Sequence, residues 1–462
     1  MALHLDLTGL FGDGSDGRLT RDEFADALPR ATAVREAHLA DKPEWRGLGT
    51  RDEFAAECRA RAEEVLRDQA PEALIVLGIG GSALGAQALL SALAPLQQES
   101  APAPGRPRVY VPDSVDPDWI GSLLDHLPLD RCHVNVISKS GGTIETSAEF
   151  LVFYDAIRQA VGSDEAARKC FTITTDPANG HFRKIADEQG FTTLTVPPGV
   201  GGRFSVLSSV GLFPAELGGM DTQSLLEGAA RVDRKLDEAP PEADPALAYA
   251  LAHVLYMERG KPIHVHFPYS HRARLLADWY AQLWGESLGK AHNLAGEAVH
   301  IGPTPVRAVG PTDQHSQCQL FMEGPDDKVY TLLKLGKFSR EIAVPEPFVD
   351  SPAFTHLRGR TLTELMEAER LGTEVALLEA GRPVCTIELC KLDAFHVGQY
   401  FLFMETATAY AGGLLGINPF DQPGVEAGKI AALALMGAPG FESRAQEIRE
   451  AMAARTLFTL SC

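Results

Sequence analysis

Apolar runs and helix-like stretches alternate along the chain from residue 73 onward. The runs ALIVL (73–77), RVYV (108–111) and CHVNVI (132–137) are each followed by a longer stretch with helical character. Near-continuous apolar strands that alternate with helices are typical of a parallel sheet covered on both faces. The pattern therefore predicts an α/β fold, in which ligands bind at the carboxyl ends of the strands.

The same alternation resumes in the second half of the chain. A new strand and helix series begins at KPIHVHFPYS (261–270) and continues to about residue 430. Before it, the stretch KLDEAPPEADPALA (235–248) is rich in proline and acidic residues, which favours a linker. A length of 462 residues also exceeds what one core usually serves. We therefore predict an N-terminal helical extension (1–70), a first αβα domain (71–220), a second αβα domain (221–435) and a C-terminal helical tail (436–462).

Composition and charge restrict the partners of the protein. The formal net charge of -20 argues against nucleic acid and against an anionic membrane surface, because both need a basic face. No apolar run reaches the length of a membrane span, and the first residues lack the pattern of a signal peptide, so we expect a cytoplasmic protein. The seven cysteines are scattered without a CxxC pair, which indicates reduced thiols.

Polar side chains gather where the strand 132–137 ends, in SKSGGTIET (138–146). Hydroxyl groups, one lysine, two glycines and the start of a helix are the components of a phosphate site. Ordinary capping of the helix by Thr143 would need only one hydroxyl. The candidate phosphate ligands are Ser138, Lys139, Ser140, Thr143 and Thr146.

A second glycine turn, LGIGGSALG (77–85), also joins a strand to a helix. It satisfies the loose dinucleotide fingerprint GxGxx(G/A), but the acidic residue expected about 20 positions later occurs only as Asp113. A turn that presents Gly80, Ser82 and backbone N–H groups at a helix start serves a phosphate or a sugar equally well. We therefore place Gly80 and Ser82 among the candidate substrate ligands.

The stretch RARLLADWYAQLWGESLGK (272–290) carries a carboxylate on its apolar face. Leu276, Trp279, Leu283 and Glu286 follow one another at steps of three and four residues, and Gly289 signals the helix end. A carboxylate in that position is suited to proton transfer. The alternative is a structural glutamate bonded to a basic neighbour.

Three further positions carry candidate chemistry. Arg203, in GGRFSVLSSVG (201–211), either faces an anion or is an ordinary surface arginine. His315 stands in a turn-rich setting, where histidines are more often structural. Lys429 follows a proline and glycine turn on an expected helix, where lysines are usually solvated.

Two stretches resemble metal sites only in part. GDGSDGRLTRDE (12–23) has glycines where a calcium loop needs its first two carboxylates. His264 and His266 fall on one face of an expected strand, with His271 nearby, but no carboxylate completes a metal site within that stretch. We therefore predict no metal, and we assign these histidines no role.

Six motifs taken together resemble the glucose-6-phosphate isomerase family in its bacterial form. They occur in the family's order over about residues 77–429 and read GIGGSALG, SKSGGTIET, GGRFSVLSSVG, GESLGK, GPTDQHSQ and NPFDQPGVEAGK. The resemblance implies two sugar-isomerase-type αβα domains with helical N- and C-terminal extensions. It also implies a homodimer, a sugar phosphate substrate and no cofactor.

The resemblance also implies a role for each matching residue. Glu286 matches the base that moves a proton between carbon 1 and carbon 2, and Arg203 matches the residue that steadies the enediolate. His315 and Lys429 match the pair that opens the sugar ring, with the histidine entering the site from the neighbouring subunit. Ser82, Ser138, Lys139, Ser140, Thr143, Thr146 and Gln422 match the residues around the phosphate or sugar.

The predicted function is therefore interconversion of glucose 6-phosphate and fructose 6-phosphate. A sugar-phosphate sensor would keep the two glycine corners but would not need Glu286, His315 and Lys429. A glutamine-dependent aminating enzyme would need an N-terminal nucleophile, and the first cysteine is Cys58. An NAD-dependent oxidoreductase would rest only on the incomplete fingerprint. An isomerase that also accepts mannose 6-phosphate stays open.

Overall fold

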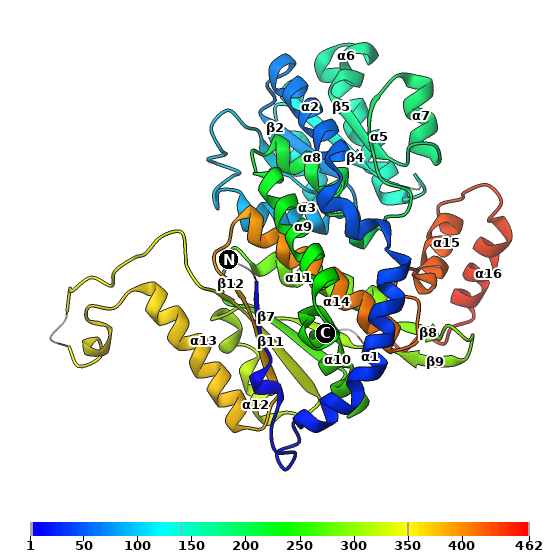
Figure 1. Ribbon diagram of the computed structural model, residues 1–462. Helices are drawn as coiled ribbons and strands as arrows, with labels where there is room; N and C mark the ends of the chain where they lie inside the picture. The colour runs from blue at the N-terminus through cyan, green and yellow to red at the C-terminus, as the bar shows by residue number, and fades with distance from the viewer. Residues whose placement is uncertain (1–2, 140, 349–350, 461–462) are drawn as a thin grey trace. The chain divides into compact units, whose positions relative to one another are not determined.

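The computed structural model describes residues 3–139, 141–348 and 351–460. By its internal contacts the chain forms two compact units, Met1–Pro419 and Phe420–Cys462. The first unit holds both large sheets (Figure 1). The second unit holds helices α15 (Glu426–Leu435) and α16 (Glu442–Ala453), which pack against each other.

The first sheet has the strand order β3-β2-β4-β5-β6, and all of its strands are parallel. Its central strands are completely buried, as their continuous apolar sequences predicted. Side chains of α4, α5 and α7 pack on one face, and side chains of α2, α3 and α8 pack on the other. The strands are β2 (Ala73–Leu77), β3 (Arg108–Tyr110), β4 (Cys132–Ile137), β5 (Phe171–Thr175) and β6 (Thr192–Thr195).

Several helices of the first half begin at a side chain that caps them. Thr20 accepts from the backbone N–H of Glu23 at the start of α1, and Asp116 accepts from that of Asp118 at the start of α4. The helices of this half are α1 (Arg21–Asp41), α2 (Asp52–Asp68), α3 (Leu84–Leu93), α4 (Pro117–His126), α5 (Ile144–Val161), α6 (Asp164–Lys169), α7 (His181–Gln189), α8 (Ser209–Leu217) and α9 (Thr222–Glu238).

The second sheet has the order β1-β12-β11-β7-β10. Its strands are parallel except β1, which pairs antiparallel with β12, so the N-terminal segment contributes a strand besides its helices. The strands are β1 (His4–Asp6), β7 (Ile263–Pro268), β10 (Thr304–Arg307), β11 (Lys328–Leu335) and β12 (Val384–Leu389). The helices of this half are α10 (Pro245–Glu258), α11 (Arg274–Leu288), α12 (Cys318–Glu323), α13 (Leu362–Glu379) and α14 (Ala394–Leu414), and β8 (Lys290–His292) pairs with β9 (Ala298–Ile301).

The proline-rich stretch 235–248 is not the predicted linker. It contains the end of α9, a short packed connection and the start of α10. Asp244 is fully buried and forms an ion pair with Arg35, with a nitrogen to oxygen distance of 2.9 Å. Its carboxylate also accepts from the backbone N–H groups of Ala246 and Leu247. The acidic residue and the following proline therefore mark a helix start, where both residue types are favoured.

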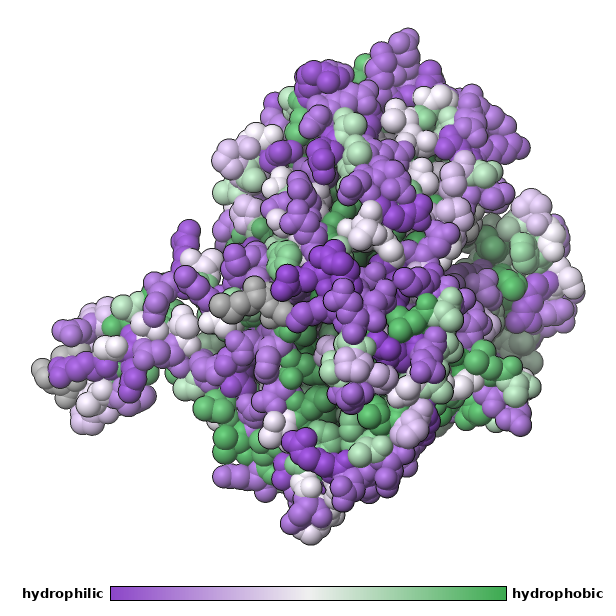
Figure 2. All heavy atoms as spheres, viewed as in Figure 1, coloured by the Kyte–Doolittle hydropathy of each residue, from purple (hydrophilic) through white to green (hydrophobic). Residues whose placement is uncertain are grey.

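The predicted fold is confirmed, with two mostly parallel sheets covered by helices. Hydrophilic side chains cover most of the face seen in Figure 2, in keeping with the net charge of -20. Within the described residues, every helix is too short or too polar to cross a bilayer.

Candidate active site

The two glycine turns of the N-terminal half meet at their backbones. A Cβ atom at Gly81 would lie 2.3 Å from the carbonyl carbon of Gly202, so only glycine fits at position 81. This contact joins the short 3-10 turn Gly80–Ser82, at the start of α3, to the turn Gly202–Phe204. Arg203 therefore lies beside the carboxyl end of β2, where a ligand is expected in this fold.

Arg203 is buried, which excludes the interpretation as a mobile surface arginine. Only 5% of the residue is exposed. Its Nε donates to Ser287 Oγ at 2.7 Å, and its Nη2 donates to the carbonyl oxygen of Pro419 at 2.5 Å. Its Nη1 lies 3.7 Å from Glu286 Oε2. Since a guanidinium stays charged in proteins, it provides a fixed positive charge next to the carboxylate.

Glu286 lies near the end of α11, on the stripe that the sequence predicted. Leu276, Trp279 and Leu283 on this stripe are all buried, whereas the Glu286 side chain is 25% exposed. The helix ends at Leu288. A carboxylate that is anchored in a buried stripe and still open to solvent can reach a small substrate.

Lys290 holds the last turn of α11. Its Nζ donates to the carbonyl oxygen of Glu286 at 2.9 Å, although the lysine is itself buried. A cation at the C-terminal end of a helix satisfies carbonyl groups that lack helical partners and complements the helix dipole. The backbone at Glu286 is therefore held by the helix itself and by the Lys290 side chain after the helix end.

Gln282 belongs to the site and was missed by the sequence reasoning. It precedes Glu286 by one helical turn, and its Nε2 donates to Glu286 Oε2 at 3.2 Å. A Cβ atom at Gly80 would lie 3.0 Å from the same Nε2, so Gln282 spans the space between the glycine turn and the carboxylate. Its Oε1 is buried and has no hydrogen-bond partner among the described residues. The four-residue spacing from Glu286 was the available signal, because such pairs share a helix face.

The predicted phosphate corner lies between β4 and α5. Ser138 is buried, and its Oγ accepts from the N–H of Gly141 at 3.1 Å. Gly141 has a φ of +69°, and a Cβ atom there would meet the backbone nitrogen of His181 at 2.6 Å, so this position requires glycine. Ser140, the fourth predicted hydroxyl, lies outside the described residues.

The hydroxyl groups of the two threonines in this corner do not cap α5. Thr143 occupies the N-cap position of α5, but the structure gives its side chain no capping hydrogen bond. Thr146 is fully buried, and its Oγ1 has no hydrogen-bond partner among the described residues. The capping alternative therefore does not account for Thr143, and both hydroxyls stand beside a helix start that favours anions.

Lys139 is engaged by the loop that leads to Arg203. Its Nζ donates to the carbonyl oxygen of Val200 at 2.9 Å and also to that of Pro198. Partial burial lowers the pKa of Lys139 from its ordinary value. An ammonium group has three donors, so one remains for a further acceptor while two hold the loop.

The remaining predicted groups lie in two other parts of the chain. His315 is exposed after the 3-10 turn Thr312–Gln314, whose Gln314 is held by Tyr269 Oη at 2.9 Å. Gln422 and Lys429 belong to the second compact unit. There Lys429 Nζ pairs with Glu426 Oε1 at 2.9 Å.

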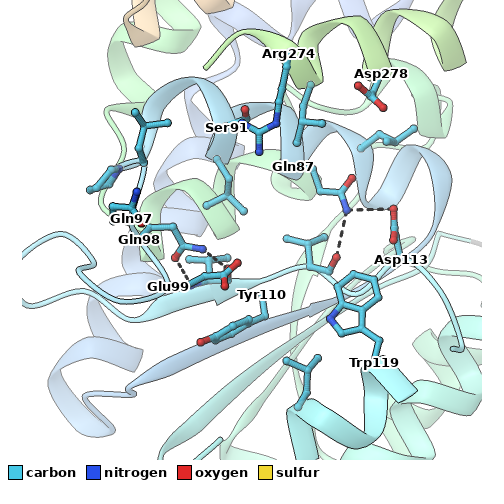
Figure 3. Close-up of a pocket in the computed structure, with 18 of the residues that line it drawn as sticks. Gln87, Ser91, Gln97, Gln98, Glu99, Tyr110, Asp113, Trp119, Arg274 and Asp278 are labelled. Carbon is cyan, nitrogen blue, oxygen red and sulfur yellow. Dashed lines mark hydrogen bonds between the residues drawn. The ribbon is translucent and has the colours of Figure 1, made fainter. Parts of the chain in front are cut away.

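A separate cavity of about 910 Å³ lies between β3, α3, α4 and α11 (Figure 3). Gln87 and Asp113 face each other on one side of it, and Gln87 Nε2 donates to Asp113 Oδ2 at 3.1 Å. Arg274 and Asp278 of α11 border it on another side. Among the described residues, its lining includes none of the predicted substrate ligands. Asp113, the acidic residue of the dinucleotide interpretation, thus belongs to this cavity.

The two partial metal motifs have other structural partners. In the calcium-like stretch, the carboxylate of Asp16 pairs with Arg18 at 2.6 Å. His264 and His266 are buried in β7 and bond to aromatic side chains. Across residues 3–139, 141–348 and 351–460, no group of three or more metal-ligating side chains comes together.

Known proteins resemble this chain over most of its length. The sequence profile of the family "Phosphoglucose isomerase" matches residues 59–447. A glucose-6-phosphate isomerase of Carboxydothermus hydrogenoformans is 42% identical over 456 residues, which cover 97% of each chain. One of Rubrobacter xylanophilus is 41% identical and covers 93% of this chain and 97% of its own.

Solved structures agree with the sequence comparison. A hypothetical protein of Thermus thermophilus superposes with a TM-score of 0.84 at 36% identity, covering 94% of this chain and all of that one. A glucose-6-phosphate isomerase of Chlamydia trachomatis, at 22% identity, shares the fold with a TM-score of 0.77 over 94% of this chain and 90% of its own. The chain therefore belongs to the phosphoglucose isomerase family, as its six motifs predicted.

Proposed function

We propose that this protein interconverts glucose 6-phosphate and fructose 6-phosphate, with Glu286 as the base that transfers the proton. The observation that carries the proposal is the pair formed by the buried Arg203 guanidinium and the partly exposed Glu286 carboxylate, 3.7 Å apart. Relatives named glucose-6-phosphate isomerase, at 41% and 42% identity, support the same reaction.

The chemistry requires one base and one fixed positive charge. In the open-chain aldose, Glu286 removes the proton from carbon 2, and the electron pair moves toward carbon 1 so that the carbonyl oxygen becomes anionic. Arg203 stabilises this enediolate charge from a position that needs no rearrangement. A proton moves between the two oxygens, and Glu286 returns its proton to carbon 1, which gives the ketose.

Binding and ring opening are assigned to the other predicted residues. The corner from Ser138 to Thr146, with Ser82, Gln422 and the N-terminus of α5, binds the phosphate or sugar. His315 and Lys429 act as acid and base on the ring oxygen and the anomeric hydroxyl. The exposed position of His315 supports its entry into a neighbouring subunit's site in a homodimer. On this proposal residues 71–220 bind phosphate and residues 221–435 carry Glu286, His315 and Lys429, in a cytoplasmic enzyme.

The test is conversion of fructose 6-phosphate to glucose 6-phosphate by the purified protein in a buffer that contains a chelator. We expect activity from the unmodified chain and a loss of at least about 100-fold in kcat for Glu286→Gln, because the amide cannot accept the proton. Glu258→Gln is the matched control, since it removes a surface carboxylate that pairs with Arg30. Full activity in Glu286→Gln would reject this base, and binding without turnover in the unmodified chain would favour a sensor.

A further inference from the structure

Two imidazole rings lie on a buried strand directly beneath α11. His264 and His266 of β7 are 2% and 0% exposed, and they point to the face of the second sheet that α10, α11 and α14 cover. The intervening Val265 belongs to the apolar cluster on the opposite face. Apolar side chains normally fill such positions in parallel sheets. The two imidazoles therefore call for an explanation.

His264 accepts a hydrogen bond from α11. The indole Nε1 of Trp284 donates to His264 Nδ1 at 2.7 Å. An indole N–H is only a donor, so His264 must be neutral with an unprotonated Nδ1. Burial lowers the pKa of His264 well below its ordinary value, which is consistent with a neutral ring. The other ring nitrogen is buried without a partner among the described residues, a cost that an apolar residue would avoid. Packing alone does not explain this side chain.

His266 provides a second connection to the same helix. Its ring stacks on Tyr280 of α11, with centroids 4.5 Å apart, and its Nε2 bonds with Tyr400 Oη of α14 at 2.8 Å. Tyr280 in turn stacks on Trp284, one helical turn later. Strand β7 thus holds one side of α11 at two successive turns.

The side of α11 that contacts β7 is opposite the side that carries Glu286. Successive residues of an α-helix are about 100° apart, so Trp284 and Glu286 project about 200° apart, as do Tyr280 and Gln282. The rings of Tyr280 and Trp284 contact β7, while Gln282 and Glu286 contact the glycine turn and Arg203. A rotation of α11 about its axis would therefore change the contacts with β7 and the contacts of Glu286 with Arg203 together.

Small rotations of this helix matter for the reaction. Side-chain tips lie roughly 5–6 Å from a helix axis, so a rotation of about 10° moves a carboxylate by about 1 Å. A displacement of about 1 Å in a reacting group can lower the rate about 100-fold. An acceptor for Trp284 on the rigid strand resists this rotation.

We propose that His264 is a positioning residue, whose hydrogen bond to Trp284 fixes the rotation of α11 and with it the place of the Glu286 carboxylate against Arg203. This inference rests on the proposed role of Glu286 as the base. It gives a role to the histidine-rich stretch of β7, and it makes the layer beneath α11 part of the isomerase's machinery although it touches no substrate.

The test compares two substitutions of similar size in the full-length protein. In His264→Asn the amide oxygen can take the place of Nδ1, whereas His264→Leu offers no acceptor. We expect His264→Leu to lower kcat for fructose 6-phosphate by about 10- to 100-fold with KM within about threefold, because the phosphate corner is unchanged. We expect His264→Asn to keep kcat within about threefold of the unmodified enzyme.

Val265→Ala is the control for loss of packing on the same strand. It removes apolar contacts on the opposite face of the sheet, so it should lower the melting temperature while kcat at 25 °C stays unchanged. The indole N–H signal of Trp284 in a nitrogen-15 correlation spectrum reports the bond directly. That signal should move further in His264→Leu, which offers no acceptor, than in His264→Asn, which keeps one.

A folded His264→Leu enzyme with unchanged kcat would overturn the proposal, as would a His264→Asn enzyme that loses as much kcat as His264→Leu. If His264→Leu does not fold, Trp284→Phe removes the donor of the same bond and keeps a smaller aromatic ring at that position. Unchanged kcat in that variant would also overturn the proposal, and a loss of about 10-fold or more would support it. Activity of Glu286→Gln is measured first, so that an incorrect base is recognised separately.

Discussion

The corner at the start of α5 and the base site at the end of α11 are built in opposite ways. At the base site, the Glu286 carboxylate already has an arginine and a glutamine beside it. At the corner, Thr143 forms no capping hydrogen bond with the described residues of α5, and the buried Thr146 Oγ1 has no hydrogen-bond partner among the described residues. Among the described residues, the carboxylate therefore has protein partners, whereas the Thr146 hydroxyl has none, which fits the ligand-binding role that we propose for the corner.

The layers beneath the two sites also differ: one is apolar, and the other contains hydrogen-bonded rings. Helix α5 rests on an apolar cluster that includes Phe150, Phe153 and Phe171. Helix α11 rests on the imidazoles of His264 and His266 and the rings bonded to them. Apolar packing is non-directional, but a hydrogen bond fixes an orientation. The comparison implies that changes at the base site alter kcat and that changes at the corner alter KM.

The largest effect should come from Arg203→Ala. The variant loses the positive charge 3.7 Å from Glu286, and with it the buried counter-charge that we propose for the enediolate. We expect kcat to fall by about 100- to 1,000-fold in the same isomerisation assay. Ser287→Ala removes one hydrogen bond of the guanidinium but leaves the charge, and it should lose far less. Equal losses in both variants would contradict the electrostatic role.

A second prediction concerns acid stability and the layer beneath α11. Burial lowers the pKa of His253 from 6.5 to about 4 and that of His266 to about 3. Because the unfolded chain then binds more protons than the folded chain, the free energy of unfolding should decrease as the pH falls from about 6.5 toward 4. For His253 the loss approaches about 3 kcal/mol at the lower end.

This dependence is measured as melting temperature against pH for the unmodified enzyme and for His253→Gln. His253 Nε2 bonds to Thr331 Oγ1 at 3.3 Å, so the variant keeps a polar group in the same layer but cannot titrate. The curve of the variant should be flatter between pH 6.5 and 4.5. Parallel curves would show that His253 does not contribute to the acid sensitivity.

The third prediction concerns the amide that the sequence analysis missed. Gln282→Leu removes the donor 3.2 Å from Glu286 Oε2 and the buried acceptor beside it. We expect kcat to fall by about 10-fold, the equivalent of one hydrogen bond to a charged group. Gln282→Glu would place a second carboxylate next to the first and should lose more. A Gln282→Leu enzyme as active as the unmodified chain would remove this residue from the site.

Local patterns in the sequence predicted the helices and turns that carry the proposed site residues. Strand, glycine turn and helix follow one another in the chain, so the corners at Gly80 and Ser138 could be located from their neighbours alone. The helical repeat placed Glu286 on a buried stripe. Contacts between distant segments leave no such pattern, and the approach of Arg203 to Glu286 joins residues more than 80 positions apart. The junction at Asp244 was mistaken for a linker because the same residue types start helices and form loops.

The smallest effect on kcat should come from the corner, through Thr146→Val. The two side chains have nearly the same shape, and the threonine hydroxyl is buried without a partner among the described residues, so the variant should be at least as stable as the unmodified chain. If the hydroxyl serves the substrate phosphate, KM for fructose 6-phosphate should rise about 10-fold while kcat changes little. Ser147→Ala is the control on the same helix, because its Oγ bonds to the carbonyl oxygen of Thr143. A rise in KM for Thr146→Val but not for Ser147→Ala would assign substrate binding to the corner. A fall in kcat instead would contradict the separation of binding at the corner from proton transfer at Glu286.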